Sequence, residues 1–198
     1  MRNILRNRLA LSTVVTTLII LVVSVLLAGV VTYFAINVTS TRVQEESLAL
    51  TKQHIWYNST SGVSQAAIMI INTGGRDIVI DKLTVRGQET NWGPGTGAKA
   101  QNISYVVTDT SIASDLKFVA NVDQYDLNSD LGLTSGTLAK LSAASTDLTL
   151  QSGKTIIIYI CSPDSITIND IGLTAAITVF TSQAMYYKET NVQAITAE

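Results

Sequence analysis

The longest hydrophobic run in the chain extends from Leu9 to Thr41, 33 residues without a charged side chain, bounded by Arg8 and Arg42. A helix of this length rises about 50 Å, which exceeds the roughly 30 Å of hydrocarbon in a bilayer. From Val14 to Val38, apolar residues fall on every face of such a helix, so no face suits water. The pattern predicts a helix that lies in lipid or is enclosed by other apolar helices.

Beyond this run the pattern narrows to a single apolar stripe. Val43, Leu50 and Tyr57 recur at intervals of seven residues, and no helix-breaking residue lies between Arg42 and Gly62. We therefore predict one helix over residues 11–57, apolar on all sides in its first half and amphipathic in its second. Hydroxyl side chains in the first half can bond the backbone carbonyl four residues earlier, so they need not disturb an apolar core. These residues are Thr13, Thr16, Thr17, Ser24 and Thr32.

The rest of the chain, residues 62–198, has a different pattern of hydrophobic and polar residues. Short runs of β-branched and apolar residues alternate with turn-forming residues, and no helical period is visible. This pattern predicts an antiparallel β-sandwich, immunoglobulin-like or similar in arrangement. The overall class is then α+β, with a long N-terminal apolar α-helix followed by a β head. The predicted strands lie at about residues 66–71, 77–86, 103–107, 116–122, 148–150, 154–161, 173–180 and 185–192.

Charge is distributed unevenly around the apolar run. Arg2, Arg6 and Arg8 precede it, and the remaining chain carries 10 Lys and Arg against 15 Asp and Glu, a net charge of −5. A nucleic-acid surface needs a basic footprint, so nucleic acid is not an expected partner. The positive-inside rule places the β head outside the cell. A secretory signal has an apolar core of only about 7–15 residues, so we expect either a retained anchor or a basic leader, residues 1–10, cut before the apolar segment.

One acidic stretch has a spacing that suits a cation. Asp126, Asn128 and Asp130 stand at alternate positions and can turn oxygen atoms toward a hard cation such as Ca²⁺. In an EF-hand loop, however, the glycine would come one position before Gly132, and a bidentate glutamate would replace Thr137. A solvated turn is the simpler interpretation, because Asp and Asn are common turn formers. Calcium is the alternative, and no other cofactor is expected.

Three Asn-x-Ser/Thr sequons begin at Asn37, Asn58 and Asn102. Asn37 falls inside the apolar helix, where no glycan is expected. Asn58 and Asn102 fall in predicted loops, and they are the glycosylation candidates if the head reaches a glycosylating compartment.

No catalytic machinery is visible in the sequence. His54 is the only histidine and Cys161 the only cysteine, and we expect an exposed helix residue and a small buried strand residue, respectively. The acidic residues of Asp123–Asp130 are the only feature of the sequence that favours the alternative of a surface hydrolase. We therefore predict that the chain is not an enzyme.

Three groups of residues resemble archaeal type IV pilins and the related archaellins. The sequence Arg8-Leu-Ala-Leu-Ser-Thr-Val-Val is similar to the junction at which a membrane peptidase removes the leader of these proteins. By this resemblance the cut falls between Ala10 and Leu11, with Leu9 standing where the family usually has a charged residue. In the head, Ile68-Met-Ile-Ile-Asn-Thr-Gly-Gly followed by Ile78-Val-Ile-Asp-Lys-Leu-Thr-Val is similar to the strand–Asn-x-Gly–strand hairpin of pilin and archaellin heads. The later segment Leu150-Gln-Ser-Gly-Lys-Thr-Ile-Ile-Ile-Tyr is similar to their glycine-and-strand element.

The resemblance implies a structural subunit of an extracellular filament that serves adhesion or motility. Its partners would be other copies of itself, the membrane before assembly, and a leader peptidase with its assembly machinery. Copies of the helix would bury one another's apolar faces in the filament core, with the β heads outside. The residues expected in that core are Val14, Leu18, Leu21, Val22, Val25 and Gly29.

A second hypothesis is an uncleaved single-span anchor at the cell surface. Its β head would bind a surface-layer protein, a glycan or a component of the archaellum motor. The mature N-terminus separates the two hypotheses, since a filament subunit would begin at Leu11 and an anchor at Met1.

Overall fold

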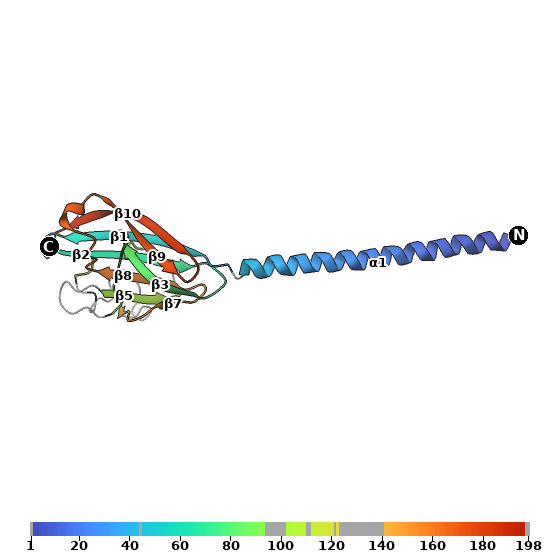
Figure 1. Ribbon diagram of the computed structural model, residues 1–198, viewed down its shortest axis with the longest axis horizontal. Helices are drawn as coiled ribbons and strands as arrows, with labels where there is room; N and C mark the ends of the chain where they lie inside the picture. The colour runs from blue at the N-terminus through green and yellow to red at the C-terminus, as the bar shows by residue number, and fades with distance from the viewer. Residues whose placement is uncertain are drawn as a thin grey trace. The chain divides into compact units, whose positions relative to one another are not determined.

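The computed structural model describes residues 2–43, 45–93, 102–109, 112–120, 122 and 141–196, and within the helix it describes the side chains of residues 11–40. The chain divides into two compact units, residues 1–44 and 45–198, and each is described by itself. The first unit is a helix, and the second, the β head, is built mainly of strands (Figure 1).

The helix α1 extends over Arg2–Val43 and therefore begins upstream of the predicted residue 11. Three of the expected hydroxyl bonds are present. Thr16, Ser24 and Thr32 donate to the carbonyl oxygen four residues earlier, over 2.9, 2.7 and 2.8 Å respectively. Thr17 instead donates to the carbonyl of Val14, three residues earlier, over 2.9 Å. These hydroxyls are satisfied within the helix and do not require water.

The prediction that the helix continues to residue 57 is wrong, because residues 48–58 form strand β1 (Leu48–Asn58). Leu48, Leu50 and Ile55 are all buried in the head. A helical continuation would leave this apolar surface unburied, and tertiary burial of this kind regularly overrides local helix propensity.

A β-bulge explains why the strand pattern is hard to see in the sequence. The register of β1 against its neighbour shifts between Thr51 and His54, and Lys52 within the bulge has a φ of 53°. A bulge inserts a residue and so moves later side chains to the opposite face of the sheet. The apolar alternation that marks a strand is therefore interrupted in the middle of β1.

The described residues of the head form one curled, mixed sheet of ten strands (Figure 1). The strand order is β4-β3-β9-β10-β1-β2-β8-β5-β6, with β7 paired to β3 outside this path. The strand-rich head is as predicted, but β1 and β10 run parallel, so the predicted antiparallel, immunoglobulin-like arrangement of two sheets is not what the pairing shows. The other strands are β2 (Val63–Asn72), β3 (Ile78–Val85), β4 (Gln88–Glu89), β5 (Asn102–Thr108), β6 (Ser142–Ala143), β7 (Leu148–Leu150), β8 (Thr155–Cys161), β9 (Thr174–Thr181) and β10 (Met185–Ile195), and a 3₁₀ helix, η2, covers Ile168–Asp170.

The inner face of the curled sheet encloses the main core. Side chains of β1, β2, β5 and β8 meet those of β3 and β9 in one buried cluster. Ile68 of β2, Ile156 of β8 and Ile177 of β9 have no exposed surface. Burial of a side chain of this size stabilises a fold by about 1.5–3 kcal/mol, so the head has an apolar core of its own.

A second cluster lies on the outer face of β2 and β8. Trp56 and Tyr159 from the sheet pack there against Leu116 and Val119. The strand predicted at residues 116–122 is therefore wrong, since the described residues of that segment are irregular and use their apolar side chains to cover the sheet.

Candidate functional site

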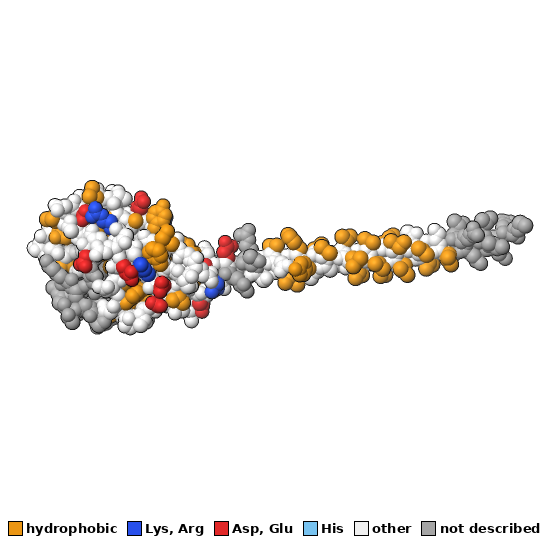
Figure 2. All heavy atoms as spheres, in the orientation of Figure 1, with side chains coloured by type: hydrophobic (Ala, Val, Ile, Leu, Met, Phe, Trp, Pro, Cys, Tyr) orange, Lys and Arg blue, Asp and Glu red, His pale blue; other side chains and the backbone are white. Residues whose placement is uncertain are grey.

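The first candidate site is the surface of helix α1. Every side chain from residue 11 to residue 40 is exposed. On the face seen in Figure 2, hydrophobic side chains follow one another along this part of the helix. Soluble monomers rarely expose apolar patches larger than a few hundred Å², so this surface requires lipid or another apolar partner. The large residues predicted for the filament core all lie on it, namely Val14, Leu18, Leu21, Val22 and Val25, with exposed fractions from 46% to 63%. A Cβ atom added at Gly29 would have no atom within 4 Å outside the local helix.

The same helix is long and apolar enough to cross a membrane. The candidate span is Leu11–Ser40, 30 residues in length. A span of this kind near an N-terminus serves either as a membrane anchor or as a signal. The bond between Ala10 and Leu11 lies within α1, and cleavage there stays a prediction.

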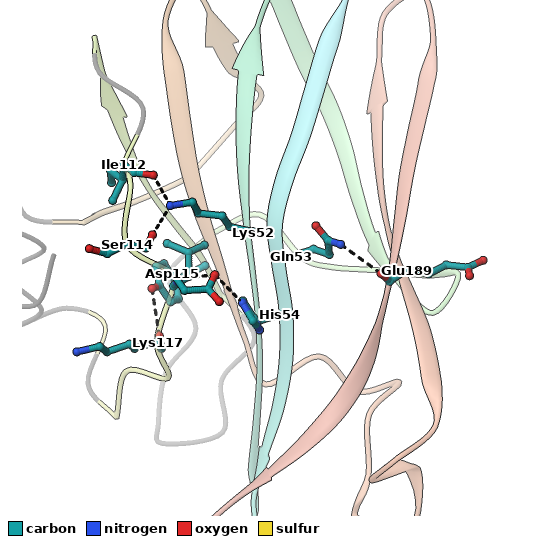
Figure 3. Close-up of polar contacts among 10 residues, drawn as sticks. Lys52, Gln53, His54, Ile112, Ser114, Asp115, Lys117 and Glu189 are labelled. Carbon is teal, nitrogen blue, oxygen red and sulfur yellow. Dashed lines mark hydrogen bonds and ion pairs between the residues drawn. The ribbon is translucent and has the colours of Figure 1, made fainter.

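The bulge in β1 carries a polar cluster that was not expected from the sequence (Figure 3). Nε2 of His54 and Oδ1 of Asp115 lie 2.9 Å apart. Nζ of Lys52 donates to the carbonyl oxygens of Ile112 and Ser114. His54 is thus a partly buried strand residue rather than an exposed helix residue as predicted. The cluster holds the irregular segment after residue 112 against the sheet.

The His54–Asp115 pair of this cluster lies at the surface of the head, where water screens its charges. The ring of His54 stacks on Trp56, with centroids 5.1 Å apart and planes inclined by 9°. The hydrogen bond with His54 is the main cause that holds the pKa of the Asp115 carboxyl below its ordinary value. Since the Asp115 side chain is 69% exposed, the pair contributes little stability.

Gln65 fixes the same segment from the sheet side. Its side-chain nitrogen donates to the carbonyl of Val119 over 3.0 Å, and the Val119 amide donates back to Oε1 over 2.9 Å. Gln65 is 2% exposed, so both bonds are protected from water. Part of the outer face of the sheet is therefore covered by residues 112–120 and 122, none of which belongs to a strand.

Asn72 is the centre of a second polar site, at the end of β2. It is 1% exposed. Its Nδ2 donates to the carbonyls of Arg76 and Leu150 over 2.8 and 3.1 Å, and its Oδ1 accepts the amide of Gly74 over 3.0 Å. One side chain thus joins the turn after β2 to the end of β7.

The turn after β2 also grips the residues that lead into β1. The amides of Thr73 and Gly74 both donate to the carbonyl of Ser47, over 3.0 and 3.1 Å. A Cβ atom at Gly74 would lie only 2.8 Å from Glu45 O and from Ser47 N, so only glycine permits this approach. We call Ser47, Asn72, Thr73, Gly74 and Ser152 the entry clasp.

A third polar site is centred on the buried carboxylate of Asp170. Oδ1 of Asp170 accepts a bond from Nη1 of Arg86 over 2.5 Å. Its Oδ2 accepts bonds from the amide and the hydroxyl of Thr167, each over 2.8 Å. The two Thr167 bonds, and after them the Arg86 guanidinium, hold the pKa of Asp170 below its ordinary value. This site ties η2 to the end of β3.

The two glycosylation candidates do not lie in open loops. Asn58 is the last residue of β1 and is 4% exposed, and its Oδ1 accepts the amides of Thr60 and Ser61 over 2.9 and 3.1 Å. A glycan on Asn58 would have to be attached before the head folds. Asn102 is the first residue of β5 and is partly buried. Occupancy of both sequons stays a prediction.

The candidate calcium ligands Asp126, Asn128 and Asp130 lie outside the described residues. Among the residues that the structure does describe, no group of three or more His, Cys, Asp or Glu side chains is placed to hold a metal ion. Calcium binding by the 126–130 segment stays a prediction.

Comparison with known proteins identifies no family. No family model matches the chain, and no curated protein matches it. Among solved structures, the ligand-binding region of Serine-glutamate repeat protein A (SgrA) of Enterococcus faecium is similar over 78% of this chain and 100% of its own. The identity is 14% and the TM-score 0.31, which is too distant to carry an argument about function.

Proposed function

We propose that this chain is the structural subunit of an extracellular filament of the archaeal type IV pilus and archaellum kind. The observation that carries the proposal is the surface of α1, where the 30 residues of Leu11–Ser40 are apolar in the main and exposed all round. Such a helix is stable in a bilayer and, outside it, only among other apolar surfaces. Identical copies supply these surfaces to one another, as helices do in a bundle.

The β head suits the outside of such a filament. It has its own apolar core, so it remains folded without burying anything against the helix. A head-to-tail contact whose rotation does not close repeats without limit, which turns a bundle of this kind into a filament. In this proposal the precursor sits in the membrane, and a leader peptidase cuts it between Ala10 and Leu11 before assembly.

A second function is an uncleaved membrane anchor that presents the head at the cell surface to a surface-layer protein, a glycan or a motor component. The span Leu11–Ser40 favours it, because 30 residues are sufficient for a single crossing. The two functions differ in what happens to the N-terminus and in what the helix contacts after maturation.

The intact mass and N-terminal sequence of the protein isolated from its native cells test the proposal. A filament subunit starts at Leu11, and an anchor starts at Met1. The same preparation is examined by electron microscopy. A start at Met1 together with an absence of filaments contradicts the proposed function.

Substitution of Leu21 tests the helix packing itself. Leu21→Asp places a charge without a partner among apolar helices, so we expect filaments to be lost. Leu21→Met, which keeps the volume and the apolar character, should assemble normally. Membrane insertion of both precursors is measured in parallel, and normal filaments from an inserted Leu21→Asp protein refute the bundled-core arrangement.

A further inference from the structure

Strand β1 is the element of the head that directly follows the helical unit. It lies in the interior of the sheet order, between β10 on one side and β2 on the other. Residues 48–51 and 54–58 pair with β2, and Ile55–Asn58 pair with Val192–Ile195 of β10. Any tension that passes between the helix and the head therefore enters the head through a strand that is paired with β2 over most of its length and with β10 over its last four residues.

The direction of β10 decides how that tension acts. Because β1 and β10 are parallel, Ile195 near the end of the chain lies beside Asn58, at the opposite end of β1 from Leu48. Tension between the start of β1 and the end of β10 therefore pulls these neighbouring strands past each other along their length. Ladder hydrogen bonds cross between strands, so all of them resist together instead of breaking one after another.

A strand separates from its neighbour more easily when its hydrogen bonds break one after another from one end, which we call peeling. The entry clasp lies at the end of β1 where peeling would begin. To peel β1 from β2, the chain must first lift Ser47 away from the turn after β2. Ser47 O accepts two backbone amides there, and its hydroxyl lies 2.9 Å from that of Thr73 in a further hydrogen bond. The first step of peeling thus requires several bonds to break at once.

The turn between β7 and β8 holds the entry clasp in place through further hydrogen bonds. Oγ of Ser152 donates to the carbonyl of Gly74 over 2.6 Å, and the amide of Gly153 donates to the carbonyl of Asn72 over 3.0 Å. The buried Asn72 side chain links the same two turns. The turn that grips Ser47 is therefore fixed to the turn between β7 and β8.

We propose that β1 and the entry clasp form a mechanical clamp, which keeps the head folded when the chain is pulled between the apolar helix and the end of β10. This inference goes beyond the filament proposal and does not depend on it. A helix held in a membrane and a helix packed in a filament both pull on the head at the same residue, the start of β1.

Single-molecule pulling of the full chain in detergent tests the clamp in two geometries. In the first, handles at the two chain termini load β1 along its length. In the second, one handle stays at the N-terminus, and the other is attached through an azido amino acid at position 76, an exposed turn residue. Since the start of β1 and this turn lie at the same end of the sheet, the second geometry peels the strand.

The clamp predicts that the head unfolds at a force at least about twice as high in the first geometry as in the second, at equal loading rate. In the first geometry, unfolding of α1 releases fewer residues than unfolding of the head, so the lengthening of the chain distinguishes the two events. In the second geometry, the α1 event is recognised as the one that also occurs in the first. Equal forces in the two geometries overturn the proposal. Because the protein is otherwise unsubstituted, this result does not depend on a variant that folds.

Two variants locate the clasp within the clamp. Gly74→Ala introduces a Cβ atom where Glu45 and Ser47 approach, and Gly29→Ala introduces one into open space and serves as the control. We expect Gly74→Ala to lower the unfolding force between the termini, to bring it near that of the peeling geometry, and to speed hydrogen exchange at Thr73. Thr73→Val removes only the two hydroxyl bonds to Ser47, one with its hydroxyl and one with its carbonyl, and should act in the same direction with a smaller effect. Unchanged force in both clasp variants overturns the role of the clasp.

Discussion

The helix α1 and the β head differ in whether their apolar side chains are buried within the chain. The described side chains of α1 are exposed, whereas residues such as Ile68 and Ile156 of the head have no exposed surface at all. The helix satisfies several of its hydroxyls internally, but the apolar side chains described in it, those of residues 11–40, are exposed. The head buries many of its described apolar side chains in two clusters of its own.

This contrast shows how to separate folding from assembly in one polypeptide. A substitution in the core of the head should change the free energy of unfolding of a single chain. A substitution on the helix should leave that free energy unchanged and alter only what the chain associates with. The predictions below test this separation, from the largest expected effect to the smallest.

The largest effect is expected from a cavity in the head core. Ile156→Ala removes buried methylene and methyl groups at a position with no exposed surface, and we expect a loss of about 2–5 kcal/mol. Leu21→Ala on the helix is the matched control and should leave head unfolding unchanged. The measurement is urea unfolding of the full chain in detergent, followed by tryptophan fluorescence. A similar loss in both variants would show that the helix stabilises the head.

A smaller loss is expected from the centre of the entry clasp. Asn72→Ala removes three hydrogen bonds, two to the carbonyls of Arg76 and Leu150 and one from the Gly74 amide, and we expect a loss of about 1–3 kcal/mol. Asn191→Ala removes an exposed amide with one side-chain hydrogen bond, to Thr174, and serves as the control. If the two variants unfold at the same urea concentration, the Asn72 bonds do not stabilise the head.

A pH-dependent effect is expected from the carboxylate of Asp170. Its pKa in the folded head is below the ordinary 3.8, so folding favours the ionised form. The resulting stability is fully present above pH 3.8 and is lost as the pH falls through the folded pKa. The urea midpoint of the unsubstituted chain should therefore fall more steeply below pH 4 than that of Asp170→Asn. Parallel curves for the two proteins would contradict a stabilising role of this carboxylate.

Much of this architecture could be predicted from local pattern alone. The apolar run defines most of α1, and β-branched runs between turn residues locate β2, β3, β8, β9 and β10 to within a few residues. Each of these elements is an apolar or β-branched run bounded by turn residues, so each carries its own signal. Strand β1 carries no such signal. Its bulge shifts the alternation in the middle of the strand, and an accidental recurrence of apolar residues every seven positions resembles the pattern of a helix.

The candidate sites depend on contacts that no local pattern encodes. The motif at Asn72 reads as a turn in the sequence, but its role comes from bonds to Leu150 and from the approach of Ser47. The segment at 116–122 has the composition of a strand, yet Gln65 supplies the hydrogen bonds that a neighbouring strand would otherwise provide. In both cases, residues distant in the sequence decide the structure.

The smallest effect is expected at the polar cluster on β1. Asp115→Asn keeps the shape of the side chain and removes its charge, and we expect less than about 1 kcal/mol of destabilisation, because an exposed ion pair is screened by water. Gln65→Leu, which removes both bonds to Val119, should release the same segment more strongly. Hydrogen exchange at Val119 separates the two variants, with fast exchange expected only in Gln65→Leu. Fast exchange in Asp115→Asn would mean that the His54 pair, and not the buried Gln65, holds the segment on the sheet.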